Sequence, residues 1–283
     1  MNVAVSVAGL LLLVVLAGCA APAPLPALRQ QAVALNQLGL QHFGAGRYAQ
    51  AERQFAAALQ LERAAEHEEG IAQNLLNLAH CALRQGQPAA AIPWLQELAA
   101  DSGWQPSAAH RAEAQLLLAL LALQRGDAAT AAQWHRAARD ACGSCSVAGK
   151  LAVFEARLAL QNGLAAEALV LARQAQQSVG SDVVEQANAL RLQGSAQLQL
   201  GQRAAAQAVL QRALALDKAA ALPPKIFQDL VLLGHAHQAD AAQQYWHRAR
   251  RVAHAAGMAA AVAEVDALLA ELAAGEPVQG GGK

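Results

Sequence analysis

Five glycines recur along this chain at nearly equal intervals, and each is followed at a fixed distance by an alanine. The intervals, by subtraction, are 40, 40, 37 and 38 residues, and the alanine lies five residues after each glycine. A period of this length indicates one supersecondary unit that is repeated and stacked, because a single unit cannot bury its own apolar face. The glycines are Gly46, Gly86, Gly126, Gly163 and Gly201, and the alanines are Ala51, Ala91, Ala131, Ala168 and Ala206.

The unit is clearest between residues 38 and 58, which read LGLQHFGAGRYAQAERQFAAA. Two helical patterns meet there at a turn that contains Gly44 and Gly46. After the turn, small and aromatic residues recur at intervals of three and four, as on one face of a helix. Small residues let the two helices approach closely, and larger apolar ones fill the groove between neighbouring hairpins.

This stretch resembles the tetratricopeptide repeat, whose pattern is W-x2-L-G-x2-Y, then A-x3-F, then P. Leu38, Gly39, Ala51 and Phe55 match, whereas Leu35, His42 and Arg63 stand where Trp, Tyr and Pro are usual. The resemblance implies an all-α fold, a right-handed α-solenoid of about five to six helical hairpins over residues 28–256. A sixth, degraded hairpin with a tighter turn is expected around residues 230–249, and an apolar helix over 257–274 is expected to cap the stack.

Composition agrees with a helical fold and excludes one class of partner. Apolar residues make up 55% of the chain, mostly as the strong helix formers Ala and Leu, and aromatic residues make up only 4%. Lys plus Arg and Asp plus Glu both number 21, so the net charge is zero. A nucleic-acid surface needs a basic stripe, so no nucleic-acid partner is expected.

The N-terminus resembles a bacterial lipoprotein signal. Residues 3–17 are almost wholly apolar and lead into Leu16-Ala17-Gly18-Cys19, although no Lys or Arg precedes them. The resemblance implies that residues 1–18 are a signal peptide and that Cys19 carries the lipid. Ala20 and Ala21 lack an Asp-type retention signal, which favours the periplasmic face of the outer membrane.

An uncleaved membrane helix is the alternative for this segment. Residues 2–18 would span about 25 Å, against a hydrocarbon core of about 30 Å, so the segment is short for that role. Residues 19–27 contain alternating prolines, which favour an extended tether between anchor and solenoid. Residues 275–283, at the other end, are expected to form a disordered tail.

Cys142 and Cys145 form a Cys-x-x-Cys pair at the end of a predicted helix. A structural disulfide suits an oxidising periplasm. A redox motif would have to open a helix after a strand, and a zinc site would need two more ligands, of which His135 could be one. The disulfide is the preferred interpretation, and a periplasmic thiol-redox or metal-binding protein is the alternative function. Cys81 is expected to be a buried thiol.

Nothing in the sequence combines a nucleophile, a base and an orienting group, and neither a HExxH, a GxSxG nor a glycine-rich phosphate loop occurs. We therefore expect no enzyme activity, no cofactor and no metal.

In tetratricopeptide-repeat solenoids the first helix of each hairpin lines a concave groove where partners lie, and this register gives candidate contacts. The groove is expected to be apolar at its N-terminal end and mildly basic in hairpins four and five, which suits an extended peptide or helix. The candidates are Asn36, Phe43, His80, Arg84, Gln124, Lys150, Arg157, Gln161, Asn188, Arg191 and Gln199.

The sequence therefore predicts a lipid-anchored periplasmic scaffold that binds protein partners in envelope assembly. Pilus or secretion apparatus, outer-membrane biogenesis and regulation of peptidoglycan enzymes are the roles that the resemblance offers, and fold alone does not choose among them. The sequence leaves the oligomeric state open.

Overall fold

The computed structural model describes residues 26–100 and 103–274, which form thirteen α-helices and contain no strand. The predictions for the signal peptide, for Cys19 and for the tail over 275–283 fall outside these ranges. The helices are α1 (Ala27–Gly44), α2 (Tyr48–Ala64), α3 (Glu68–Arg84), α4 (Pro88–Ala99), α5 (Ala108–Gln124), α6 (Ala128–Cys142), α7 (Ala148–Gln161), α8 (Ala165–Ser178), α9 (Val183–Gln199), α10 (Arg203–Ala219), α11 (Pro223–Ala236), α12 (Ala239–Ala255) and α13 (Ala259–Ala273).

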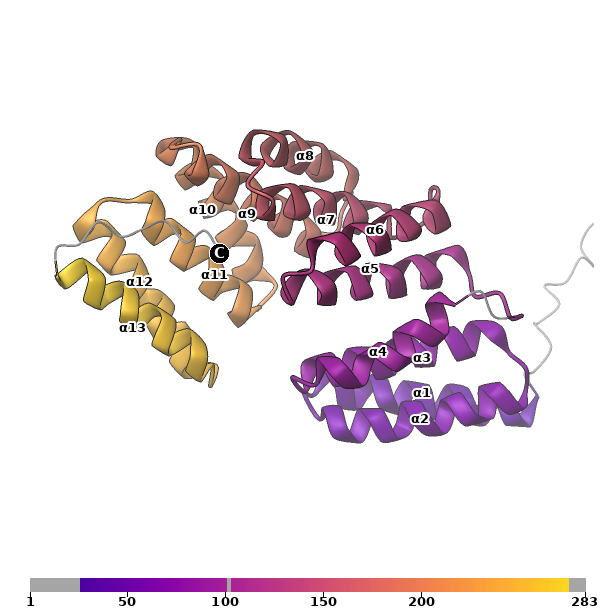
Figure 1. The fold of residues 1–283 in the computed structure, drawn as a ribbon. Coiled ribbons are helices and arrows are strands. Elements are labelled where there is room, and N and C mark those ends of the chain that lie inside the picture. Colours follow the sequence, from indigo (N-terminus) through magenta and orange to yellow (C-terminus); the bar gives the residue numbers. More distant parts are fainter. Residues whose placement is uncertain (1–25, 101–102, 275–283) are drawn as a thin grey trace, which may run out of the picture.

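Consecutive helices pack as six hairpins, from α1/α2 to α11/α12, followed by α13. The hairpins stack into an arch whose two ends curve toward the same side (Figure 1). In the middle of the arch α7 and α9 lie on the inner side, and α8 and α10 lie on the outer side (Figure 1). The predicted all-α helical-repeat solenoid is thereby confirmed.

The five recurring glycines end the first helix of each of the first five hairpins. All five have a positive φ, between 71° and 77°, which glycine adopts without steric cost. At the first turn Gly46 N–H donates to Phe43 O at 3.0 Å, and Arg47 N–H donates to His42 O at 2.9 Å. This pair of bonds is a Schellman motif, which satisfies the last carbonyls of the helix and reverses the chain.

Inside three hairpins a glycine faces a large side chain of the partner helix. A β-carbon on Gly39 would lie 2.5 Å from the Phe55 ring, and one on Gly194 would lie 2.4 Å from Leu210. In the sixth hairpin a β-carbon on Gly234 would lie 2.0 Å from the Trp246 ring. In each of these three hairpins, the large side chain of the second helix therefore fills the space that the glycine of the first helix leaves free.

The two ends of the stack differ. Within residues 26–100 and 103–274, α1 is the first helix, and its Leu38 and Leu40 are 39% and 50% exposed. At the C-terminal end α13 lies on α12 with Val265 fully buried, while Leu268 and Leu272 pack half-buried against the core of α10–α12. The outer face of α13 is exposed, as expected of a capping helix.

Candidate partner-binding surface

Side chains of consecutive first helices bond to one another along the inner side of the arch. Lys150 Nζ on α7 donates to Glu113 Oε1 on α5 at 2.9 Å. Each of these residues lies thirteen positions before the turn glycine of its own hairpin (163 − 150 and 126 − 113). Gln161 Nε2 on α7 donates to Leu123 O on α5 at 3.2 Å. Lys150 and Gln161 therefore connect α7 to α5 along this side of the arch.

At the N-terminal end of this surface the polar and aromatic candidates are also paired. Asn36 Nδ2 on α1 donates to Asn74 Oδ1 on α3 at 2.9 Å. The Phe43 and Tyr48 rings meet edge to face with their centroids 5.3 Å apart, and the Arg84 guanidinium lies 5.8 Å from the Tyr48 centroid. Such cation–π contacts are weak at exposed sites, so Arg84 stays available to a partner.

His80 is half-buried on α3, and burial lowers the pKa of its imidazole below the ordinary value. Glu113 opposes this shift, and the nearby charges of Lys150 and Arg84 reinforce it. A histidine in this setting is neutral at pH 7, so it offers a partner a hydrogen bond and no charge.

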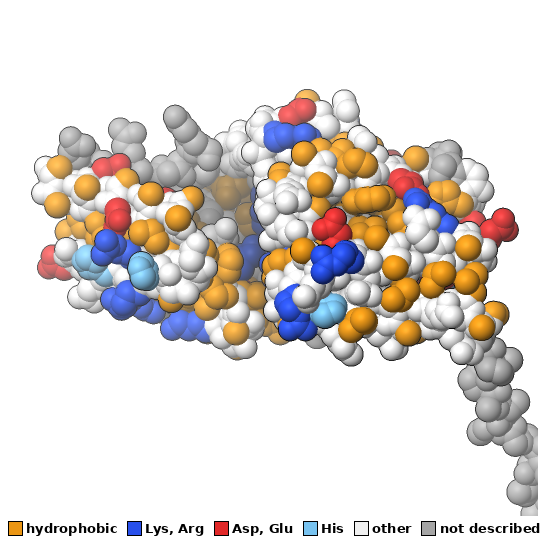
Figure 2. All heavy atoms as spheres, turned by 90° about the horizontal axis from the view of Figure 1, so that it is seen from below, with side chains coloured by type: hydrophobic (Ala, Val, Ile, Leu, Met, Phe, Trp, Pro, Cys, Tyr) orange, Lys and Arg blue, Asp and Glu red, His pale blue; other side chains and the backbone are white. Residues whose placement is uncertain are grey.

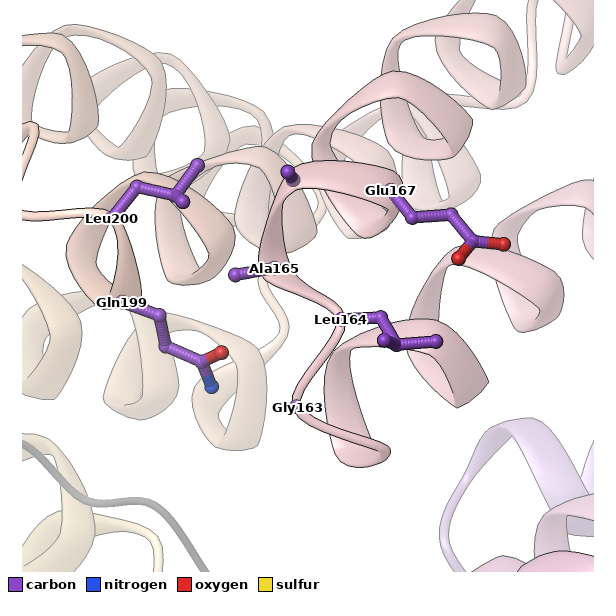
Figure 3. Close-up of a pocket in the computed structure, with 7 residues that line it drawn as sticks. Gly163, Leu164, Ala165, Glu167, Gln199 and Leu200 are labelled. Atoms are coloured by element: carbon purple, nitrogen blue, oxygen red, sulfur yellow. The ribbon is translucent and has the colours of Figure 1, made fainter.

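Gln124 and Gln199 are exposed near the C-terminal ends of α5 and α9. Gln199 borders a shallow depression where the α7–α8 turn meets the end of α9 (Figure 3). Glu167 is the one titratable side chain among the seven residues that line this depression, and it points away from Gln199 (Figure 3). This hollow therefore holds no pair of groups for acid–base chemistry.

Arg191 is buried, whereas the sequence placed it on the groove surface. Its Nε donates to Asp229 Oδ1 at 2.7 Å, its Nη1 donates to Asn188 Oδ1 at 2.8 Å, and its Nη2 bonds Asp217 Oδ2. Asn188, also placed in the groove, is buried beside it. Because the guanidinium joins α9, α10 and α11, Arg191 supports the inner surface from beneath instead of facing a partner.

One of the two carboxyl groups around Arg191 has a raised pKa. Burial raises the pKa of the Asp229 carboxyl to about 7, and a hydrogen bond with Asp217 adds to the rise, although Arg191 opposes it. Asp217 Oδ1 and Asp229 Oδ2 are both buried, and neither has a further heavy-atom partner within the described part of the chain. Near neutral pH the Asp229 carboxyl is therefore partly protonated.

Two more cations lie beside this network. Arg157 on α7 and Lys225 on α11 are half-buried, and neither side chain has a hydrogen bond or ion pair to any residue in 26–100 or 103–274. Burial, together with the charges of Arg191 and Arg157, lowers the pKa of Lys225 to about 8. Burial and Arg191 also lower the pKa of Arg157. Arg157 was a predicted groove residue, whereas sequence reasoning missed Lys225.

Cys142 and Cys145 form a disulfide at the C-terminal end of α6. His135, the possible third ligand of a metal site, instead packs in the core, where its Nε2 lies 3.1 Å from Leu151 O and its ring lies tilted against that of Phe154, with the centroids 5.1 Å apart. The residues that the structure describes contain no group of three His, Cys, Asp or Glu side chains that could hold a metal ion. Cys81 is buried, and burial raises the pKa of its thiol to about 11.

Comparison with known proteins agrees with the repeat geometry. Residues 30–100 match the family model described as tetratricopeptide repeat. The chain matches no curated protein. It is similar to a chain in the crystal structure of the APC/C hetero-tetramer Cut9–Hcn1, with a TM-score of 0.62 and 14% identity over 83% of this chain and 43% of that one. The match thus spans less than half the length of that chain.

Two further solved structures match with lower TM-scores. The complex of the TPR2AB domain of yeast Sti1 with pHSP90 gives a TM-score of 0.36 and 15% identity, over 86% of this chain and 99% of that one. The structure of Pseudomonas aeruginosa PilF gives a TM-score of 0.38 and 16% identity, over 87% of this chain and 94% of that one. Residues 30–100 thus resemble the tetratricopeptide repeat, and the described chain shares its fold of stacked helical hairpins with the first of these structures. Among the described helices, none has both the length and the apolarity needed to cross a bilayer.

Proposed function

We propose that this chain is an adaptor that binds protein partners along the inner side of its arch. The supporting observation is the continuous inner surface that α3, α5, α7, α9 and α11 form, hollowed between the two ends of the molecule (Figure 2). Solenoids of stacked helical hairpins use such concave surfaces for binding. The hollow is open and partly polar, which suits an extended peptide or a helix better than a small substrate.

The second part of the proposal concerns the place of action. The Leu16-Ala17-Gly18-Cys19 sequence supports a lipid on Cys19 and an anchor in the outer membrane, with the solenoid in the periplasm. The disulfide between Cys142 and Cys145 is compatible with that oxidising compartment. An anchored adaptor of this kind would serve envelope assembly, in a pilus or secretion apparatus, in outer-membrane biogenesis or in the control of peptidoglycan enzymes.

Site-specific photo-crosslinking in cells tests the binding surface. A photoreactive residue is placed at Gln124 or Gln199 on the inner side, and at Arg173 of α8 or Arg212 of α10 as matched exposed controls. We expect the two inner positions to crosslink to the same envelope protein and the two control positions to give none of it. Equal crosslinking at all four positions, or crosslinking at the control positions alone, would overturn the proposal.

Mass spectrometry of the mature N-terminus tests the anchor. We expect a first residue Cys19 that carries acyl chains, and a Cys19→Ala variant that is neither acylated nor recovered with the outer membrane. An intact Met1 would support an uncleaved membrane helix and would reject the lipid anchor, while the crosslinking result would stand independently.

A further inference from the structure

The depression at the α7–α8 turn exposes two large apolar side chains. Leu164 in that turn is 50% exposed, and Leu200 at the end of α9 is 38% exposed. Leu200 points toward the first turn of α8 (Figure 3). The depression has a volume of about 480 Å³, and its lining consists of Gly163, Leu164, Ala165, Ala166, Glu167, Gln199 and Leu200. An apolar hollow that stays open to solvent is a candidate contact for another protein.

Local structure gives no reason for a leucine at position 164. Leu164 is the N-cap of α8 and follows a turn glycine directly. The N-caps after the other four turn glycines are all polar, namely Arg47, Gln87, Asp127 and Gln202. Asp127 accepts a hydrogen bond from Thr130 N–H at 3.0 Å, whereas Leu164 makes no such bond. Leucine is among the least favourable N-cap residues, so its half-exposed side chain points to a role outside the helix.

One carboxylate stands beside this apolar surface. Glu167 is exposed in the first turn of α8, three residues after Leu164, and the two side chains project to the same side of the turn (Figure 3). Within residues 26–100 and 103–274 the Glu167 side chain has no hydrogen bond or ion pair. The depression therefore combines two exposed leucines with one negative charge that no neighbouring cation neutralises.

We propose that a segment of the protein partner crosses this depression, with one large apolar side chain between Leu164 and Leu200 and a lysine or arginine at Glu167. The inference rests on the proposed function and extends the contact over the edge of the groove, because Gln199 borders both. The cation complements the single carboxylate, and the apolar side chain complements the leucines. So shallow a depression would leave much of a small molecule in water, so a protein segment fits it better.

Selection from a random-peptide display library tests this chemistry with the full-length chain in nanodiscs of phosphatidylethanolamine and phosphatidylglycerol. Peptides that bind the parent chain are depleted on Leu164→Asp, which leaves those that need the leucine. Gln87→Asp is the control, because it places the same residue at the equivalent N-cap of α4. We expect the retained peptides to combine a large apolar residue with Lys or Arg. Their affinity should fall about tenfold for Leu164→Asp and stay unchanged for Gln87→Asp.

Two outcomes of the selection would overturn the proposal. One is that no peptide depends on Leu164, and the other is that the retained peptides lack the combination of an apolar residue and a cation. Unfolding is excluded by urea denaturation, since aspartate is a favoured N-cap and should leave the midpoint unchanged or raise it. Leu200→Gln is a second variant, which copies Gln85 at the equivalent position of hairpin two and should weaken the same peptides.

A double-mutant cycle tests the contact with Glu167. Glu167→Gln in the chain and replacement of the peptide's cation by glutamine should each weaken binding about threefold. The two changes together should weaken it no more than either alone, because each removes the same ion pair. Independent effects would reject the contact between Glu167 and the cation, and with it the proposed partner chemistry.

Photo-crosslinking in cells separates this inference from the proposed function. A photoreactive residue replaces Ala166 in the depression, or Ala89 at the equivalent exposed position of α4 as the control (166 − 163 and 89 − 86). We expect Ala166 to capture the same envelope protein as Gln124 and Ala89 to capture none of it. Capture at Gln124 without capture at Ala166 would reject the contact at the depression and leave the groove function standing. A product of two copies of this chain at Ala166 would replace the partner segment with a second copy.

Discussion

The N-terminal hairpins and the α9–α11 region repeat one backbone pattern with two different kinds of contact between helices. Around α3 the buried residues are mainly leucine and alanine, such as Leu75, Leu78 and Ala79. Around α9 the chain buries Arg191 together with Asp217 and Asp229, and these side chains join three helices through directional bonds. The same repeat therefore accepts a nonspecific apolar contact or an ionic one that fixes the positions of its neighbours.

The difference carries an energetic lesson. Apolar burial stabilises in proportion to area and tolerates small changes of shape. A buried ion pair contributes little beyond an apolar contact of equal volume, yet removing one partner leaves an unpaired charge. We therefore expect the α9–α11 region to lose more stability than the N-terminal hairpins when one charged residue is replaced. We expect it to lose less when all the partners of the ion pair are replaced together by apolar residues.

Arg191→Met should destabilise the protein most, because it leaves two buried carboxyl groups without their cationic partner. We expect a loss of about 3–5 kcal/mol in the free energy of unfolding, measured by urea denaturation. Arg191→Met combined with Asp217→Leu and Asp229→Leu should recover most of that loss. Leu75→Ala in α3, with an expected loss of about 2–5 kcal/mol, is the apolar counterpart. A triple variant that is less stable than Arg191→Met would contradict the comparison.

Gly39→Val probes the apolar region with an intermediate effect. The new side chain would overlap the Phe55 ring, so we expect a loss of about 1–3 kcal/mol in thermal or urea unfolding. Phe55→Ala in the same chain should make the glycine substitution less costly, because the two positions share one volume. Gly44→Ala is the control, since a β-carbon there meets nothing within 4 Å and should not destabilise the protein. Equal losses with and without Phe55 would show that shared volume is not the cause.

The smallest expected effect is a dependence of stability on pH that arises in the α9–α11 region. Asp229 has a pKa of about 7 in the folded protein, above its ordinary 3.8, so the folded state holds the proton more tightly than the unfolded state does. Stability from this group is therefore present below about pH 4 and is lost as pH rises toward 7. We expect a decline of about 1–2 kcal/mol, because the pair shares its charge.

Urea unfolding of the parent chain and of Asp229→Asn, compared between pH 4 and 7, measures this dependence. The asparagine variant should show a flatter dependence over that window. An unchanged slope in Asp229→Asn would mean that other groups set it.

The repeat could be predicted from the sequence because the residues that form its turns lie close together in the chain. Gly46 and the glycines at equivalent positions mark the turns. The contact between Gly39 and Phe55 depends on the spacing within one hairpin. The bond between Lys150 and Glu113 joins residues at equivalent positions in neighbouring hairpins, so the period of the repeat brings them together. The predicted fold class, which depends on this local pattern and its period, is the part that the structure confirms.

The ionic cluster was not readable in the same way, because its partners come from three helices. Asp217 and Asp229 look like ordinary charges on helix surfaces until the packing of α9, α10 and α11 is known. One signal was present, since Asp229 lies between the apolar pairs Ile226-Phe227 and Leu230-Val231, where a buried carboxylate needs a partner. Lys225 was missed because its position beside the Arg191 network depends on how α9 and α11 pack together.

The three-way contact of Arg191 also has a mechanical consequence. A stack of hairpins bends by small slips between neighbours, and apolar contacts permit such slips more readily than bonds of fixed direction. Because Arg191 fastens α9, α10 and α11 to one another, that part of the arch resists bending. We therefore expect the stiffness of the molecule to be uneven, with the α9–α11 part of the arch stiffer than the parts that apolar contacts hold together.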